Sequence, residues 1–232
     1  MSDDRRPTMK RLAIITAAGT GERMQSSLPK QFLLLSGMPV LMHTIKKFEG
    51  VVNEIMVTLP ENYIDYWKKL CAEYDFHIPH TMVTGAGTRF ESIKNAIEKI
   101  EGDDALVAVH DGVRPMISES LIKNIFSSAE KNGNAVPFVS LSESIRSLDG
   151  EKNMYADRKK FVSIQTPQCF RLSSLRKACA QKISEAFTDD ATAVESATGE
   201  KIFLVEGEKQ NIKMTTYSDF DYCESIMEKI AG

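Results

Sequence analysis

Residues 12–31 read LAIITAAGTGERMQSSLPKQ, and the interpretation of the whole chain starts from this stretch. Leu12–Thr16 is mostly apolar and partly β-branched, which predicts a short buried strand. Ala17–Gly21 has little side-chain bulk, and glycine adopts backbone conformations that other residues resist. Such a loop after a strand lets backbone N–H groups approach phosphate oxygens. Two cations follow, Arg23 and Lys30, and they are suited to stabilise negative charge that develops on a phosphorus atom.

The loop alone leaves a second interpretation open, because an ordinary strand-turn-helix connection also uses small residues. The dinucleotide-binding fingerprint requires a third glycine where Met24 stands, and the phosphate-loop pattern G-x-x-x-x-G-K-[ST] is absent. The full pattern from Gly19 to Lys30, G-x-G-x-R-M-x4-P-K, resembles nucleotidyltransferases that activate sugars and polyols. The PKQF that ends it resembles their cytidylyltransferase branch.

The composition is that of an ordinary globular α/β protein. The chain has 232 residues, of which 42% are hydrophobic and 26% charged, and its net charge is −3. This length suits a single domain over residues 10–232, preceded by a mobile tail at 1–9. The net charge argues against non-specific nucleic-acid binding.

The sequence also argues against a membrane protein and against a structural metal. No apolar run reaches the roughly 20 residues of a membrane span, and no apolar signal segment is visible at the start. The four cysteines lack C-x-x-C spacing, and the four histidines are dispersed, so we expect no structural zinc. A cytoplasmic protein is the simplest prediction.

Strand and helix patterns alternate along most of the chain. We expect strands at residues 54–59, 81–84, 106–109, 135–139, 162–166, 201–205 and 212–215. We expect helices at residues 40–48, 63–74, 89–100, 121–131, 172–183, 190–197 and 219–230. The alternation predicts a three-layer α/β fold with a mostly parallel sheet, whose strand-end loops meet along one edge where ligands bind.

Residues 140–160 interrupt this alternation. The segment is polar, SESIRSL alternates as a strand does, and Asp149-Gly150 predicts a hairpin turn. We therefore expect a β-arm that projects from the domain. Exposed strand edges are usually covered by a partner, and a second copy of the chain is the simplest one, so the arm predicts a homodimer.

GAGTRFES at residues 85–92 follows a predicted strand. Its backbone could approach a base or ribose while Ser92 supplies a hydroxyl. The alternative is an ordinary turn in which Thr88 caps the next helix.

HDGVRP at residues 110–115 also follows a strand. Asp111 could order a metal-bound phosphate or a ribose, and Arg114 could hold a substrate phosphate with two hydrogen bonds. The alternative is an Asp–Arg pair that only fixes the loop. We expect His110 to be a packed, hydrogen-bonded residue and not a catalytic base.

No serine or cysteine nucleophile is evident, since G-x-S-x-G is absent and no cysteine has an obvious base beside it. Chemistry by positioning and charge neutralisation suits phosphoryl and nucleotidyl transfer. Arg158 would take part only if the arm reaches an active site. Lys213 projects to one face of the strand expected at 212–215.

Six motifs, in order, resemble the 2-C-methyl-D-erythritol 4-phosphate cytidylyltransferase family: AAGTGERM with LPKQ, GAGTRFES, VHDGVRP, IQTPQ, TDDATAVE and EGEKQNIKMT. The resemblance implies a Rossmann-like domain with a dimerising β-arm. It implies transfer of the cytidylyl group of CTP to a polyol phosphate by in-line attack on the α-phosphate, with release of diphosphate. It also implies Mg²⁺, carried mainly by the CTP phosphates, so no metal-binding residue is expected.

The resemblance also implies roles for particular residues. Arg23 and Lys30 would stabilise the α-phosphate during attack, while Lys213 and a partner subunit's copy of Arg158 would position the polyol phosphate. The polyol-phosphate pocket would be completed by Asp111, Arg114, Ser144 and Thr166. The expected CTP-binding residues are Ala17, Ala18, Gly19, Thr20, Gly21, Ala86, Ser92 and Gly112.

Other functions remain as alternatives. Val113 also occurs in ribitol 5-phosphate cytidylyltransferases, whereas TDDATAVE and NIKMT resemble the methylerythritol branch. A non-catalytic nucleotide-binding regulator would have less need of Arg23 and Lys30. A nicotinamide-dependent oxidoreductase is disfavoured by the incomplete glycine fingerprint.

Overall fold

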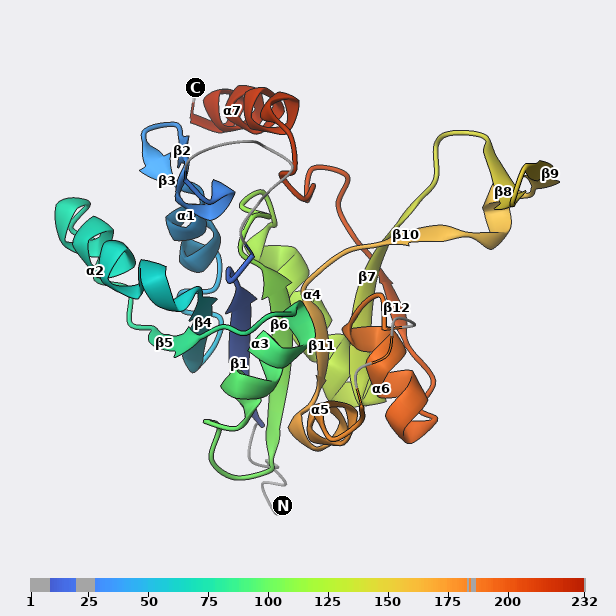
Figure 1. Cartoon of the computed structure of the whole chain (residues 1–232), viewed down its shortest axis with the longest axis horizontal. Coiled ribbons are helices and arrows are strands. Elements are labelled where there is room, and N and C mark those ends of the chain that lie inside the picture. Colours follow the sequence, from blue (N-terminus) through green and yellow to red (C-terminus); the bar gives the residue numbers. More distant parts are fainter. Residues whose placement is uncertain (1–8, 20–27, 183, 185–186, 232) are drawn as a thin grey trace, which may run out of the picture.

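An eight-stranded sheet forms the centre of the computed structural model, which describes residues 9–19, 28–182, 184 and 187–231. The strands are β1 (Lys10–Thr16), β4 (Glu54–Leu59), β5 (Thr81–Thr84), β6 (Ala105–Asp111), β7 (Asn134–Ser140), β10 (Val162–Ile164), β11 (Gln168–Arg171) and β12 (Leu204–Glu206). Their order is β10-β7-β11-β6-β1-β4-β5, and β12 pairs with β7 (Figure 1). The prediction of a mostly parallel sheet is confirmed.

The parallel part of the sheet places three strand ends together. Strand β1 is parallel to both β4 and β6, and Thr16 aligns with Thr58 on one side and with Asp111 on the other. The interior of β1, Leu12–Ile15, has no exposed surface, as expected for a parallel strand covered on both faces. The carboxyl ends of β1, β4 and β6 therefore form one edge.

Helices cover both faces of the sheet, which gives the three layers expected from the sequence (Figure 1). They are α1 (Val40–Lys46), α2 (Ile64–Glu73), α3 (Arg89–Ile97), α4 (Glu119–Asn132), α5 (Leu172–Cys179), α6 (Asp190–Thr198) and α7 (Tyr217–Ala231). Short 3-10 helices are η2 (Lys30–Phe32), η3 (Glu61–Tyr63) and η4 (Arg158–Lys160). Helices α1, α2 and α4 pack on one face through a core that includes Leu41, Trp67 and Phe126. Helices α3, α5 and α6 pack on the other.

A small third cluster lies beyond the sheet edge. Helix α7 covers the hairpin of β2 (Leu34–Leu35) and β3 (Met38–Pro39), and Phe220 packs there with Met214 and Val113. This packing holds the chain near Met214 beside the loop after β6. No helix in the part of the chain that the structure describes is long and apolar enough to cross a membrane.

The β-arm is a two-stranded antiparallel hairpin of β8 (Ile145–Asp149) and β9 (Lys152–Ala156). Figure 1 shows it extending away from the sheet at the end of β7 and β10. Asp149 pairs with Lys152, so the tight turn is Gly150-Glu151, one residue later than expected. The projecting arm is confirmed, and its role in dimerisation stays a prediction.

Some expected elements are wrong or shorter. Residues 212–215 are not a strand, because the backbone N–H of Met214 donates to the carbonyl of Val113 in a loop and joins no ladder. The strand expected at 201–205 is limited to β12. Strand β11, which runs antiparallel between β6 and β7, was missing from the prediction. Of the expected tail, residues 1–8 lie outside the described residues and Met9 packs against the core.

Candidate active site

A cavity of about 700 Å³ opens at the carboxyl ends of β1, β4 and β6. It is bounded by the loop after β1, the start of η2, the loop after β5 and the segment beyond β6. The predicted site residues that line it are Ala17, Ala18, Gly19, Lys30, Ala86, Ser92, Asp111 and Lys213. Lys30 and Lys213 thus come from opposite ends of the sequence to the same cavity. The predicted Thr20, Gly21 and Arg23 lie outside the described residues.

The loop after β1 is held from two sides. The N–H of Ala17 donates to the Thr58 carbonyl at 3.0 Å. The side-chain amide of Gln31 donates to the carbonyls of Ala17 and Gly19 at 2.7 and 3.1 Å. Gln31 is 2% exposed, and it follows Lys30 directly. Sequence reasoning did not assign a role to Gln31, although PKQF contains it; the amide fixes the loop relative to Lys30.

The loop after β5 fits closely against the loop after β1. A Cβ built on Gly85 would lie 2.2 Å from the Cβ of Ala18 and 3.3 Å from the Leu59 carbonyl oxygen. Gly85 also donates its N–H to that carbonyl at 2.7 Å. The two loops that wall the cavity therefore touch at Gly85, where there is no room for a side chain larger than the hydrogen atom of glycine.

Helix α3 begins with Thr88 as its cap, which is the ordinary-turn alternative given in the sequence analysis. Thr88 accepts from the N–H of Glu91, and the Glu91 carboxylate accepts from the N–H of Thr88, which completes a capping box. The Ser92 hydroxyl accepts from the N–H of Ala86 and donates to the Thr88 carbonyl, both at 2.9 Å. Ser92 lines the cavity, but its hydroxyl is used to shape the loop.

Gly112 lies behind the loop after β1. A Cβ on Gly112 would be 3.1 Å from the Ala17 Cβ, the Leu41 Cδ1 and the Thr16 carbonyl oxygen. Gly112 is absent from the cavity lining, so the structure gives it a packing role, and its contact with CTP stays a prediction.

Asp111 lies at the centre of a charge cluster. Its Oδ2 is 3.0 Å from the Arg114 Nε and 3.2 Å from the Lys213 Nζ, and its Oδ1 is 3.4 Å from the Arg89 Nε. Burial acts to raise the pKa of Asp111, but Arg89, Lys213 and Arg114 outweigh it and hold this pKa well below its usual range. The carboxylate stays ionised, and the Asp–Arg pair considered from the sequence is present.

Arg89 joins Asp111 to a second carboxylate. Its two terminal nitrogens donate to the Asp190 oxygens at 2.7 and 2.9 Å, a bidentate pair. Burial acts to lower the pKa of Arg89, and the charges of Asp190 and Asp111 raise it further than burial lowers it. Arg89 lines the cavity, whereas Asp190 does not. Sequence reasoning assigned no role to either residue, although GAGTRFES and TDDATAVE contain them.

Thr166 and His110 hold the backbone of this cluster. The Thr166 hydroxyl oxygen accepts from the N–H of Asp111 and lies 3.1 Å from the His110 Nδ1. The His110 Nε2 is 3.1 Å from the Arg114 carbonyl, which can only accept, so the ring carries its proton on Nε2. His110 has no exposed surface, and burial lowers its pKa to about 4. It is a packed, neutral residue, as expected.

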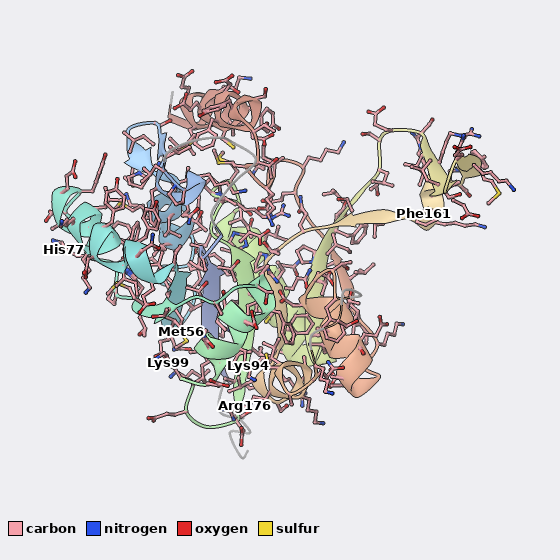
Figure 2. All side chains as sticks on the ribbon, in the orientation of Figure 1. Met56, His77, Lys94, Lys99, Phe161 and Arg176 are labelled. Atoms are coloured by element: carbon pink, nitrogen blue, oxygen red, sulfur yellow. The ribbon has the colours of Figure 1, made fainter. Side chains whose placement is uncertain are left out.

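The two predicted arm residues lie away from the cavity of their own chain. Arg158 donates to the carbonyl of Ser142, and both Arg158 and Ser144 are exposed. Neither lines the cavity. Figure 2 shows Phe161, three residues beyond Arg158, out on the arm side of the molecule.

The model of the 2-C-methyl-D-erythritol 4-phosphate cytidylyltransferase family matches residues 12–229. The chain is 43% identical to a protein of that name from Porphyromonas gingivalis, over 94% of this chain and 98% of the relative. It is 40% identical to one from Bacteroides thetaiotaomicron, over 94% and 100%.

Solved structures agree with these matches. The cytidylyltransferase of the same name from Thermus thermophilus has a TM-score of 0.76 at 29% identity, covering 95% of this chain and all of that one. The 4-diphosphocytidyl-2C-methyl-D-erythritol synthase from Anaerococcus prevotii has a TM-score of 0.79 at 26% identity, covering 95% and 99%.

Proposed function

Because the chain belongs to the 2-C-methyl-D-erythritol 4-phosphate cytidylyltransferase family, we propose that it carries out this family's reaction in the cavity above β1. The enzyme transfers the cytidylyl group of CTP to 2-C-methyl-D-erythritol 4-phosphate, giving 4-diphosphocytidyl-2-C-methyl-D-erythritol and diphosphate. The main support for placing the reaction in this cavity is that Lys30 and Lys213 line it together with the small-residue loop.

The nucleotide half of the site is the side walled by the loops after β1 and β5. CTP binds against Ala17–Gly21, Ala86 and Ser92, with Gly112 supporting the loop from behind. The short side chains leave backbone groups accessible to the triphosphate and the base. Lys30, together with Arg23, stabilises charge on the α-phosphate as the acceptor phosphate attacks in line and diphosphate leaves.

The half of the site that binds the acceptor, the polyol phosphate, is the charge cluster around Asp111. Arg89, Arg114 and Lys213 carry three positive charges against the two negative charges of Asp111 and Asp190. The remaining positive charge suits a phosphate group. Lys213 lines the cavity and holds that phosphate. Arg114 is not part of the lining and adds its positive charge from beside Asp111. Asp111 orients both cations, and Thr166 fixes the Asp111 backbone.

We propose that Mg²⁺ enters on the triphosphate. Among the residues that the structure describes, two carboxylates line the cavity, Glu61 and Asp111, and Asp111 already contacts three cations. The described residues contain no group of three His, Cys, Asp or Glu that could hold a metal. This donor set fits a metal bound by nucleotide oxygens, where Mg²⁺ would neutralise charge and orient the phosphates.

We also propose that two chains pair through the arm. Met154 of the hairpin is 63% exposed, and an isolated two-stranded hairpin is at best marginally stable in water. On the opposite face, Leu148 and Tyr155 are 81% and 77% exposed and form an uncovered apolar surface. A second copy would cover this surface and would bring Arg158 and Ser144 to the partner's acceptor site. All four cysteines are free, which fits the reducing cytoplasm.

Mixed dimers test the shared site. A chain with Lys30→Ala alone and a chain with Arg158→Ala alone should each be inactive or weak. Mixing the two should restore one working site per dimer, since one site then holds both native residues. The control mixes each variant with itself under the same exchange conditions. Absence of recovery, with mixed dimers demonstrated by two different tags, would contradict the contribution of the arm.

The role of Lys30 is tested separately. Lys30→Ala should lower kcat far more than it raises the KM for CTP, because the ammonium acts chiefly on the transition state. Lys68→Ala is the control, since Lys68 is exposed and pairs with Asp65 away from the cavity. A rise in the KM for CTP with unchanged kcat would show that Lys30 only binds the nucleotide.

A further inference from the structure

Arg89 has its three guanidinium nitrogens divided between two carboxylates. The two terminal nitrogens face the Asp190 oxygens at 2.7 and 2.9 Å, and the Nε faces the Asp111 Oδ1 at 3.4 Å. The Asp111 carboxylate is divided in the same way, because Oδ1 faces Arg89 while Oδ2 faces Arg114 and Lys213. Each group thus restricts how its neighbour can turn.

The position of Asp190 is set by the sheet. Asp189 caps α6, since it accepts from the N–H of Thr192 at 2.9 Å. Gln168 of β11, which is 1% exposed, donates to the Asp189 carboxylate at 2.9 Å and accepts from the N–H of Ala191 at 2.8 Å. The first turn of α6 is therefore fixed to a strand that pairs with β6, the strand that ends at Asp111.

We propose that Arg89 and Asp190 are positioning residues for the acceptor phosphate, which they affect through Asp111. Asp190 occupies both terminal nitrogens of Arg89, so only the Nε is left for Asp111. Without Asp190, the fork of Arg89 is free to take both oxygens of Asp111, which would draw the carboxylate away from Lys213 and Arg114. The pair thereby keeps Lys213, which lines the cavity, and Arg114 beside it in place.

The inference rests on the proposed role of Lys213 and Arg114 in binding the acceptor, and it makes a selective prediction. Asp190 is 4% exposed and does not line the cavity, so it reaches the substrate only through Arg89 and Asp111. The hydrogen bonds described above that hold the loops after β1 and β5 do not involve Asp190. A loss of fold or of general stability would affect both substrates, whereas loss of positioning affects the acceptor alone.

The test compares Asp190→Asn with the wild-type enzyme in steady-state assays that vary each substrate in turn. Asparagine keeps the volume and removes the charge. We expect the KM for 2-C-methyl-D-erythritol 4-phosphate to rise by about tenfold, the effect typical of weakening one charge-assisted hydrogen bond. The KM for CTP should change by less than about twofold, a difference too small to reflect a lost contact of that kind.

Two further variants keep the outcome unambiguous. Arg89→Lys retains the charge but loses the fork, and it should reproduce the selective rise even if Asp190→Asn folds poorly. The matched control is Asp103→Asn, because Asp103 pairs with Arg176 of α5 at the opposite end of the sheet (Figure 2). It should leave both KM values unchanged.

A third variant in the same experiment tests the proposed function itself. Lys213→Met should raise the KM for the acceptor. If it does, while Asp190→Asn and Arg89→Lys leave that KM unchanged or raise both KM values equally, the positioning inference is wrong. If Lys213→Met itself has no effect on the acceptor, the assignment of the acceptor site is wrong, and the positioning inference is wrong with it.

Discussion

Replacement of Gly85 by alanine is the most specific perturbation that the structure suggests. The new methyl group would lie 2.2 Å from the Ala18 Cβ, whereas carbon atoms pack at about 3.5–4.0 Å. The neighbouring Leu59 carbonyl oxygen, at 3.3 Å, blocks the other direction. The loop after β1 must therefore retreat by roughly 1.5 Å to reach an ordinary carbon–carbon separation.

Such a shift should lower the catalytic rate strongly and the unfolding free energy moderately. A misplacement of about 1 Å can lower the rate by about 100-fold when the reacting groups must be aligned. Overpacking typically costs about 1–3 kcal/mol of unfolding free energy. We therefore expect Gly85→Ala to remain folded while kcat/KM for CTP falls by about 100-fold.

Gly87→Ala is the matched control in the same loop. Among the described residues, a Cβ on Gly87 would meet the Glu91 Oε2 alone, at 3.5 Å, which is an ordinary contact. Both variants are assayed by diphosphate release at varied CTP. Their fold is checked by the fluorescence of Trp67, the single tryptophan, which has no exposed surface. Equal kcat/KM for CTP in the two variants would refute the argument from loop contact.

Three other predictions concern stability and assembly. Gln31→Leu leaves two loop carbonyls without their donor, so it should lower the unfolding free energy by about 1–3 kcal/mol and raise the KM for CTP; unchanged values in both would contradict its role. The burial-lowered pKa of His110, about 4, means that the unfolded chain binds a proton first as pH falls, so stability should decrease from about pH 6.5 towards pH 4. Urea titrations across that window should show a weaker pH dependence in His110→Gln, and an equal dependence would contradict this source. Leu148→Lys on the arm should shift the chain to a monomer and lower activity together, and an active monomer in sedimentation would argue against the shared site.

The parts of the fold that sequence predicted are those with a strong local signal. Strands β4 and β5 have the expected limits because Pro60 follows the first and Gly85 the second, and both residue types commonly end a strand. Thr88 was named as the cap in the ordinary-turn alternative, and the structure shows it capping α3. The arm followed from polarity and from Gly150, whose positive φ the turn requires.

The parts that sequence reasoning missed depend on distant partners. Residues 212–215 alternate like a strand, but their place is decided by Val113 and α7. Strand β11 follows Pro167 closely and is short, so its pairing with β6 and β7 defines it.

The same limit applied to the site. Lys30, Asp111 and Lys213 were identified by motif and by resemblance, and the structure brings them to one cavity. Arg89 and Asp190 were overlooked because their importance lies in the ion pair between them, across 101 positions of sequence. Neither helix shows that pairing by its own pattern.

The central claim is tested most directly by diphosphate release from CTP and Mg²⁺, with 2-C-methyl-D-erythritol 4-phosphate and ribitol 5-phosphate offered in parallel to the wild-type enzyme and to Lys30→Ala. The account predicts turnover of the methylerythritol phosphate by the wild type, little with ribitol phosphate, and a strongly reduced rate in Lys30→Ala. Preferred turnover of ribitol 5-phosphate, or no turnover of either substrate by a folded, CTP-binding protein, would contradict it.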